Sequence, residues 1–152
     1  MNDKRRVLCT GAGGAAGMNF IKSLRKAPEW FYIVGTDSSK YYAKLSQADK
    51  TYVMPYYLKP DYFERLTEIV VNEGIDFIHA QPDPEVRLLS DNRDKLKARM
   101  FLPDAHTIRI AQDKYRFNVL MRDYNIPAPA TEKVIDPENL QLLLIGNQKK
   151  LW

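Results

Sequence analysis

Residues 10–17 read Thr-Gly-Ala-Gly-Gly-Ala-Ala-Gly and place four glycines within seven residues. A short apolar run precedes this segment and apolar residues at helical spacing follow it, which predicts a strand, a tight turn and a helix. Glycine lets a backbone approach a ligand closely, and the first N–H groups of a helix carry a partial positive charge. We therefore expect a carboxylate or phosphate group to bind the backbone amides of four residues: Gly11, Ala12, Gly13 and Gly14. The alternative is that these glycines serve only a tight turn and close packing of the strand on its helix.

Asp37 is the strongest single acidic candidate in the first half of the chain. It follows Gly17 by 20 residues, about the interval at which a dinucleotide fingerprint places its ribose-binding acid. It also ends an apolar run over residues 31–37, and ligands of open α/β sheets bind at the carboxyl ends of the strands. We expect Asp37 to line the binding pocket. An Asx turn with Ser38 or Ser39 is an equally good interpretation.

A second polar group follows the strand expected over residues 76–80. The segment 81–85 reads Gln-Pro-Asp-Pro-Glu, in which Asp83 can cap a helix that begins with proline. We expect Gln81 and Asp83 to shape the same pocket as Asp37, with His79 and Glu85 close by. A lone histidine near the end of a buried strand is more often structural than catalytic, and no residue is assigned as catalytic.

The elements that must position these residues alternate between strand and helix. Apolar runs predict strands over residues 7–10, 31–37, 51–55, 76–80 and 100–103, and helical spacing or caps predict helices over 15–27, 41–48, 61–73, 85–96, 105–111 and 113–124. Near-continuous apolar strands are typical of a parallel sheet that is covered on both faces. The sequence therefore predicts a three-layer, Rossmann-like α/β fold with a mostly parallel sheet.

Three segments follow from this pattern. Residues 1–111 form the Rossmann-like domain, and residues 112–130 form a connecting helix and a proline-rich linker. Residues 131–152 are expected to be the truncated start of a second domain, with a strand at 133–135, a helix from 136 to 145 and a further strand beginning at 149.

Composition narrows the function classes. The chain has 152 residues, 45% of them hydrophobic, a net charge of +4, one cysteine and two histidines. Lys and Arg are mixed with acids and form no basic stripe, so no nucleic-acid partner is expected. No apolar run is long enough to cross a membrane, and the lone Cys9 in an apolar strand points to a reduced, cytoplasmic setting without disulfides. So few histidines and cysteines leave little material for a zinc site or a thiol–imidazole pair, and no metal site is expected.

Five segments in a fixed order carry a family resemblance: Val7-Leu8-Cys9-Thr10-Gly11-Ala12-Gly13-Gly14, Gly35-Thr36-Asp37, Gln81-Pro82-Asp83, Gln112-Asp113-Lys114-Tyr115-Arg116-Phe117 and Ile126-Pro127-Ala128-Pro129. Together they resemble the N-terminal part of ATP-grasp proteins related to the carbamoyl-phosphate synthase large subunit. The resemblance implies a pre-ATP-grasp domain, and Asp113 and Lys114 would then mark the lead into the ATP-grasp domain.

The resemblance also implies a ligase that uses ATP and Mg²⁺ to activate a carboxylate or bicarbonate as an acyl phosphate, which an amine captures. The groups that hold ATP and magnesium would lie beyond Trp152, so the isolated chain is expected to be inactive. Its partner would be the missing ATP-grasp half, as a domain or as a subunit.

Two alternatives stay open. Residues 10–17 are also similar to the cofactor loop of short-chain dehydrogenases and epimerases, in which Asp37 would select NAD. That class needs a Tyr-x-x-x-Lys pair, and no lysine in this chain has a tyrosine four residues before it. The other alternative is a non-catalytic subunit of a split ATP-grasp enzyme, or a homo-oligomer, that docks through apolar residues at 142–145.

Overall fold

The computed structural model describes residues 5–146, with side chains up to residue 141. The chain separates into two compact units, residues 1–108 and 109–152.

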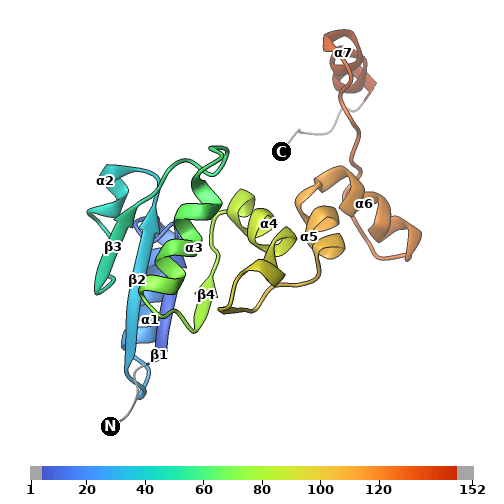
Figure 1. The fold of residues 1–152 in the computed structure, drawn as a ribbon. Helices are drawn as coiled ribbons and strands as arrows, with labels where there is room; N and C mark the ends of the chain where they lie inside the picture. The colour runs from blue at the N-terminus through green and yellow to red at the C-terminus, as the bar shows by residue number, and fades with distance from the viewer. Residues whose placement is uncertain (1–4, 147–152) are drawn as a thin grey trace. The chain divides into compact units, whose positions relative to one another are not determined.

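A five-stranded sheet forms the centre of the first unit. Its strands are β1 (Arg5–Thr10), β2 (Phe31–Asp37), β3 (Lys50–Val53), β4 (Phe77–His79) and β5 (Arg99–Met100). All neighbouring pairs are parallel, in the order β3-β2-β1-β4-β5 (Figure 1). The predicted parallel sheet is confirmed, although β4 and β5 are shorter than their apolar runs. Because β1 lies in the middle, the loop that follows it faces the ends of both β2 and β4.

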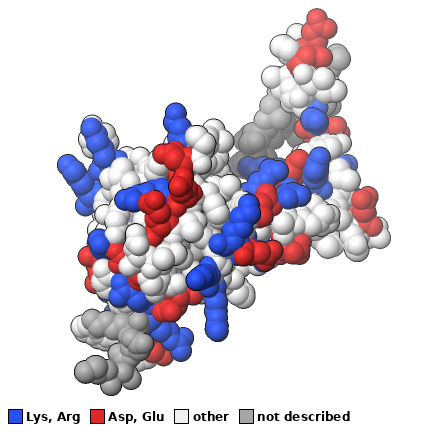
Figure 2. Space-filling model, in the orientation of Figure 1, with Lys and Arg blue, Asp and Glu red and all other residues white. Residues whose placement is uncertain are grey.

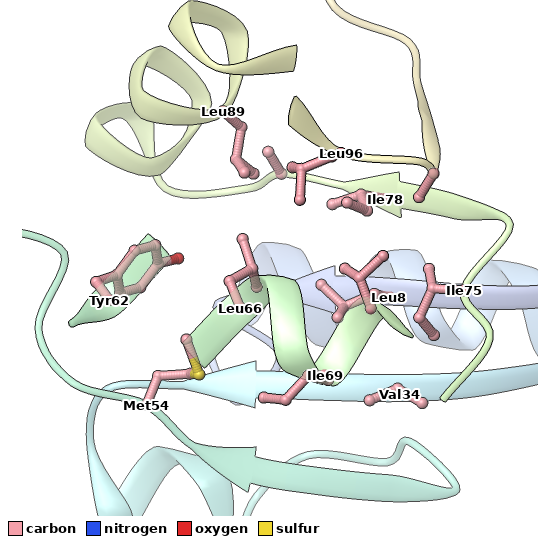
Figure 3. Close-up of a cluster of buried hydrophobic side chains, with 13 residues drawn as sticks. Leu8, Val34, Met54, Tyr62, Leu66, Ile69, Ile75, Ile78, Leu89 and Leu96 are labelled. Atoms are coloured by element: carbon pink, nitrogen blue, oxygen red, sulfur yellow. The ribbon is translucent and has the colours of Figure 1, made fainter. Parts of the chain in front are cut away.

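Helices cover both faces of this sheet, as the apolar strands predicted. The helices of the first unit are α1 (Ala15–Arg25), α2 (Lys40–Ala43), α3 (Tyr62–Asn72) and α4 (Asp83–Asp91), followed by a 3₁₀ turn at Arg93–Lys95. On one face Leu8, Val34 and Ile78 pack with α3 and α4, through residues such as Leu66 and Leu89 (Figure 3). On the other face Cys9 and Ile33 pack with Ile21 of α1. Alternate strand residues therefore build two separate apolar layers, one on each side of the sheet.

Two helices differ from their predictions in length. The helix expected over residues 41–48 is a single turn, α2, whose first amides donate to the Ser39 hydroxyl. The helix expected over residues 85–96 begins two residues earlier, at Asp83, and ends at Asp91. Asp61 is the N-cap residue of α3, but its side chain forms no cap hydrogen bond.

The second unit contains the end of α5 (Ala105–Gln112), α6 (Lys114–Asp123) and α7 (Pro137–Gly146). Asp113 caps α6 by accepting from the Arg116 amide at 3.0 Å, and Asp136 caps α7 by accepting from the Asn139 amide at 2.7 Å. The strand predicted at 133–135 is wrong, because these residues pair with no strand in the described chain. The strand expected from residue 149 lies outside the described residues.

Figure 2 shows both Lys and Arg and Asp and Glu side chains on the visible face. Within the described residues, no helix has both the length and the apolar character needed to cross a membrane.

Candidate functional site

The glycine-rich loop between β1 and α1 is shaped by three close approaches. Gly11 has a φ of +60°, which favours glycine, and a Cβ there would lie 2.9 Å from the Pro82 ring. A Cβ at Gly13 would lie 1.8 Å from the Tyr42 carbonyl oxygen, and one at Gly17 would lie 2.3 Å from the Gly11 carbonyl oxygen. These three glycines are therefore required for packing, whatever ligand the loop binds.

The loop uses most of its own amides internally. The Ala12 amide donates to the Thr36 carbonyl at 3.0 Å, and the Gly14 amide donates to the Gly11 carbonyl at 3.0 Å. The Gly13 amide donates to Asp37 Oδ2 at 3.2 Å. Three of the four amides expected to bind an anion thus already have acceptors within the protein.

The open amides lie one turn further along the chain. Ala15, Ala16 and Gly17 form the first turn of α1, where N–H groups have no intrahelical acceptor. Among the described residues no hydrogen bond from these three amides occurs. The positive end of α1 therefore supplies an anion-binding position at residues 15–17.

Asp37 ties the loop to the end of β2. The residue is 9% exposed, and its Oδ1 accepts from the Ser39 amide at 2.9 Å while Oδ2 accepts from the Gly13 amide. The Asx interaction with Ser39 is therefore present. Because Asp37 also lines the hollow beside the loop, the structural and the binding interpretation apply to the same side chain.

Gln81 and His79 connect the end of β4 to the same edge. The Gln81 amide donates to Thr10 Oγ1 at 3.1 Å, and Gln81 Oε1 lies 3.0 Å from His79 Nε2. The His79 ring stacks on Phe20 of α1, with ring centroids 3.7 Å apart. His79 thus acts as a packed, hydrogen-bonded structural residue, whereas Gln81 lines the hollow.

Asp83 differs from its expected place. Pro82 is the N-cap of α4 and Asp83 is the first helical residue, so Asp83 does not cap the helix. Its side chain is exposed, and it is not among the described residues that line the hollow.

Glu85, two residues further on, occupies the position in the hollow that Asp83 was expected to take. It is 7% exposed, and its Oε2 has no hydrogen-bond partner among the described residues. Burial, and secondarily the charge of Asp37, raise the pKa of the Glu85 carboxyl. The sequence analysis placed Glu85 in the polar cluster at this edge of the sheet, with His79 and Gln81, but did not predict its burial.

Two buried groups next to this carboxylate are held in their protonated forms. Burial, followed by the charge of Glu85, raises the pKa of the Cys9 thiol to about 12. Burial and Glu85 also raise the pKa of the Tyr62 hydroxyl. Cys9 is therefore a small buried hydrophobe at neutral pH and not a thiolate nucleophile.

Together these residues enclose a hollow of about 350 Å³ at the carboxyl edge of the sheet. It is lined by Gly11, Gly14, Ala15, Ala16, Gly17, Asp37, Ser38, Tyr42, Gln81, Pro82 and Glu85. The lining therefore combines the first residues of α1, whose amides are open, with the two acids Asp37 and Glu85.

Asp113 and Lys114 belong to the second unit. Asp113 is the N-cap of α6 and Lys114 is the first residue of that helix. Their assignment to the start of an ATP-grasp domain stays a prediction, as do the predicted boundaries at residues 111 and 130. Within the described chain, no group of three or more His, Cys, Asp or Glu side chains could hold a metal ion.

A sequence profile described as "PylC-like, N-terminal domain" matches residues 7–100, the segment that holds the hollow and all of the sheet except the first two residues of β1. The chain belongs to this family. No curated protein sequence matches the chain. The PylC-like match ends near β5, so it covers the part of the first unit from which the site is built.

Solved structures show the same fold for the PylC-like chain. The biotin carboxylase domain of a single-chain bacterial carboxylase matches with a TM-score of 0.60 and 15% identity, over 94% of this chain and 34% of that one. An L-amino acid ligase from Bacillus licheniformis matches with a TM-score of 0.64 and 8% identity, over 100% of this chain and 36% of that one.

A third structure carries ligands. It is the biotin carboxylase domain of 2-oxoglutarate carboxylase from Hydrogenobacter thermophilus, in complex with MgADP, ADP and bicarbonate. It matches with a TM-score of 0.57 and 16% identity, over 95% of this chain and 33% of that one. The chain thus spans about a third of each of these structures. The likenesses confirm the Rossmann-like pre-ATP-grasp fold and give no support to the NAD alternative.

Proposed function

We propose that this chain is the substrate-side N-terminal domain of an ATP-grasp carboxylate–amine ligase. The PylC-like match and the shared fold with an L-amino acid ligase and biotin carboxylases support this assignment. In such a ligase, ATP activates a carboxylate or bicarbonate as an acyl phosphate, as in carbamoyl-phosphate synthases, and an amine captures it.

The lining of the hollow carries the proposal about the substrate. Glu85 and Asp37 are two acids in this lining, and one buried oxygen of Glu85 has no hydrogen-bond partner in the described chain. The first residues of α1, with their open amides, line the same space. A free amino acid fits this pattern, with its carboxylate at the α1 amides and its ammonium group toward Glu85.

Catalysis is assigned to the other half of the ligase. The chain spans about a third of its structural neighbours. We therefore expect the chain alone to bind the amino acid but not to hydrolyse ATP. The ATP-grasp half would be supplied by the same polypeptide or by a second subunit.

Calorimetric titration of the 152-residue chain with a panel of free amino acids tests the proposal. Each amino acid that binds is compared with its N-acetyl and methyl ester derivatives, which remove one charge each. Both derivatives should bind at least about tenfold more weakly, because each loses one charge-assisted contact.

Two variants locate the site. Glu85→Gln should remove the preference for the free amine over the N-acetyl derivative, whereas the exposed control Glu64→Gln should retain it. Equal binding of the free and the N-acetylated amino acid by the unmodified chain would overturn the proposed substrate class. ATP hydrolysis by the chain alone would overturn the assignment of catalysis to the missing half.

A further inference from the structure

A second hollow lies at the opposite end of the strands from the glycine-rich loop. It has a volume of about 860 Å³, which is in the range of small-molecule sites. Its lining comes from the starts of β1 and β4, from β5 and from one side of α1: Arg5, Arg6, Val7, Phe20, Leu24, Phe31, Gly74, Ile75, Asp76, Phe77, Lys97 and Arg99. We call it the amino-edge hollow.

The floor of the amino-edge hollow is apolar. Helix α4, which connects β4 to β5, covers the opposite face of the sheet and therefore leaves apolar side chains of β4 uncovered on this face. Ile78 packs there with Leu89 of α4, so the neighbouring Phe77 points to the face of α1. Phe20 and Leu24, one turn apart on α1, line the same hollow as Phe77, and the Phe20 ring is also stacked on His79. All three side chains are only half-buried, so a flat apolar group can cover them.

The rim carries an excess of positive charge. Arg6 is already committed, because its guanidinium pairs with Glu73 at 3.1 Å and lies 4.1 Å from the centroid of the Tyr32 ring. Asp76, the one acid in the lining, accepts from the Arg6 amide at 2.8 Å. Arg5, Lys97 and Arg99 form no ion pair or side-chain hydrogen bond within the described part of the chain.

We propose that the amino-edge hollow binds a small organic anion in which a flat apolar group carries a carboxylate, sulfonate or phosphate. The apolar group packs on Phe20, Leu24 and Phe77, and the acidic group pairs with Lys97 and Arg99. This site is separate from the hollow beside the glycine-rich loop, because β1 runs from Arg5 at the amino-edge hollow to Thr10 next to that loop. It does not depend on the proposed ligase activity.

A fluorescence titration with 8-anilinonaphthalene-1-sulfonate tests the site, because this probe combines an aromatic body with one negative charge. The double charge reversal Lys97→Glu/Arg99→Glu should weaken binding at least about tenfold, since two attractive pairs become repulsive. The double reversal Lys59→Glu/Arg122→Glu changes net charge equally at exposed positions outside this lining and should leave the affinity unchanged. Equal affinity of both double variants would overturn the proposal.

Two further titrations decide between occupants. Inorganic sulfate should compete only weakly with the probe, because it cannot cover the apolar floor. Competition by sulfate at the affinity of the aromatic probe would show that only the charges matter, and would overturn the proposal. Tighter probe binding after deletion of residues 2–4 would show that the chain's own N-terminus fills the hollow, which would also overturn it. Unchanged binding in the deletion variant supports an external ligand.

Discussion

Glu85 is a buried acid whose ionisation opposes folding. Its folded-state pKa is raised above the ordinary value of 4.5 by burial and by the charge of Asp37. The folded state therefore favours the protonated carboxyl, and stability should fall as pH rises from about 4.5 through the folded-state pKa. Interactions with the hydroxyl groups of Thr10 and Tyr62 lower this pKa but offset the effect of burial only in part.

We predict that Glu85→Gln stabilises the chain at neutral pH. The substitution should raise the free energy of unfolding by about 1 kcal/mol at pH 7.5, because an ionised carboxylate oxygen without a partner no longer has to be buried. Near pH 4 the gain should vanish, since both proteins are then uncharged at this position. Urea unfolding at the two pH values measures the difference. A variant less stable than the parent at neutral pH would contradict the prediction.

Gly14 and Gly17 should respond differently to an added methyl group. A Cβ at Gly17 would lie 2.3 Å from the Gly11 carbonyl oxygen, whereas one at Gly14 would meet nothing closer than 3.4 Å. We expect Gly17→Ala to cost about 1–3 kcal/mol of unfolding free energy through overpacking. Gly14→Ala should leave stability within about 0.5 kcal/mol but place a methyl group in the hollow and weaken amino acid binding.

Thermal unfolding and calorimetry of the two alanine variants separate packing from binding. Gly13→Val would not make this distinction, because its side chain would collide with the Tyr42 backbone and not with a ligand. Equal loss of stability in both alanine variants would show that the loop has no free space at Gly14.

At the scale of elements, the sequence correctly predicted those helices and strands that are determined by the local pattern of apolar and capping residues. Near-continuous apolar runs such as 31–37 identified a sheet that is buried on both faces, and Asp113 marked the start of a helix that the structure confirms. The strand at 133–135 failed because a β-branched run becomes a strand only where another strand is available to pair with it.

The site was predicted less well than the fold, for a related reason. Which loop amides remain open depends on hydrogen bonds between Gly13 and Asp37, and between Ala12 and Thr36, residues 24 apart in the chain. Likewise, the burial of Glu85 depends on how α4 packs, which a helix-start pattern does not report. The residue types predicted at which edge of the sheet the site lies. Which amides there remain open, and which acids are buried, depends on tertiary contacts.

The end of α3 is joined to two strands by a charged cluster. Glu73 Oε1 accepts from Lys50 Nζ at 2.6 Å and from the Tyr52 hydroxyl, and its Oε2 pairs with Arg6. The hydrogen bond from Lys50, followed by that from Tyr52, lowers the pKa of the Glu73 carboxyl below 4.5. The ionised form of Glu73 therefore stabilises the fold. This contribution is lost as pH falls from 4.5, the ordinary pKa of the carboxyl, through its lower pKa in the folded state.

We predict that Glu73→Gln lowers the free energy of unfolding at pH 7 by about 1 kcal/mol, because charge-assisted hydrogen bonds become neutral ones. The difference from the parent chain should shrink as pH falls from 4.5 toward the folded-state pKa. Urea unfolding at pH 7 and at pH 3.5 measures it, with the exposed Glu68→Gln as the control. A stability gap that is independent of pH would contradict the electrostatic explanation.

At the scale of the whole molecule, both apolar clusters belong to the first unit. The described residues of the two clusters fall between Leu8 and Leu102. In the second unit, by contrast, Phe117 and Tyr124 are 43% and 71% exposed, although their helical spacing is that of a core stripe. The stability of the sheet thus rests on side chains of the first unit.

We therefore predict that residues 1–111 fold without the rest of the chain. This fragment retains every strand, both apolar clusters and the cap that Asp104 forms by accepting from the Thr107 amide at 2.9 Å. Its thermal midpoint should lie within about 5 °C of that of the 152-residue chain, a shift that corresponds to roughly 1 kcal/mol for a domain of this size. Differential scanning calorimetry measures the midpoint, and a titration of the fragment with the amino acid that the longer chain binds tests whether the site is intact. An unfolded fragment would show that the second unit stabilises the first, whereas a folded fragment that has lost amino acid binding would show that the site needs residues beyond 111.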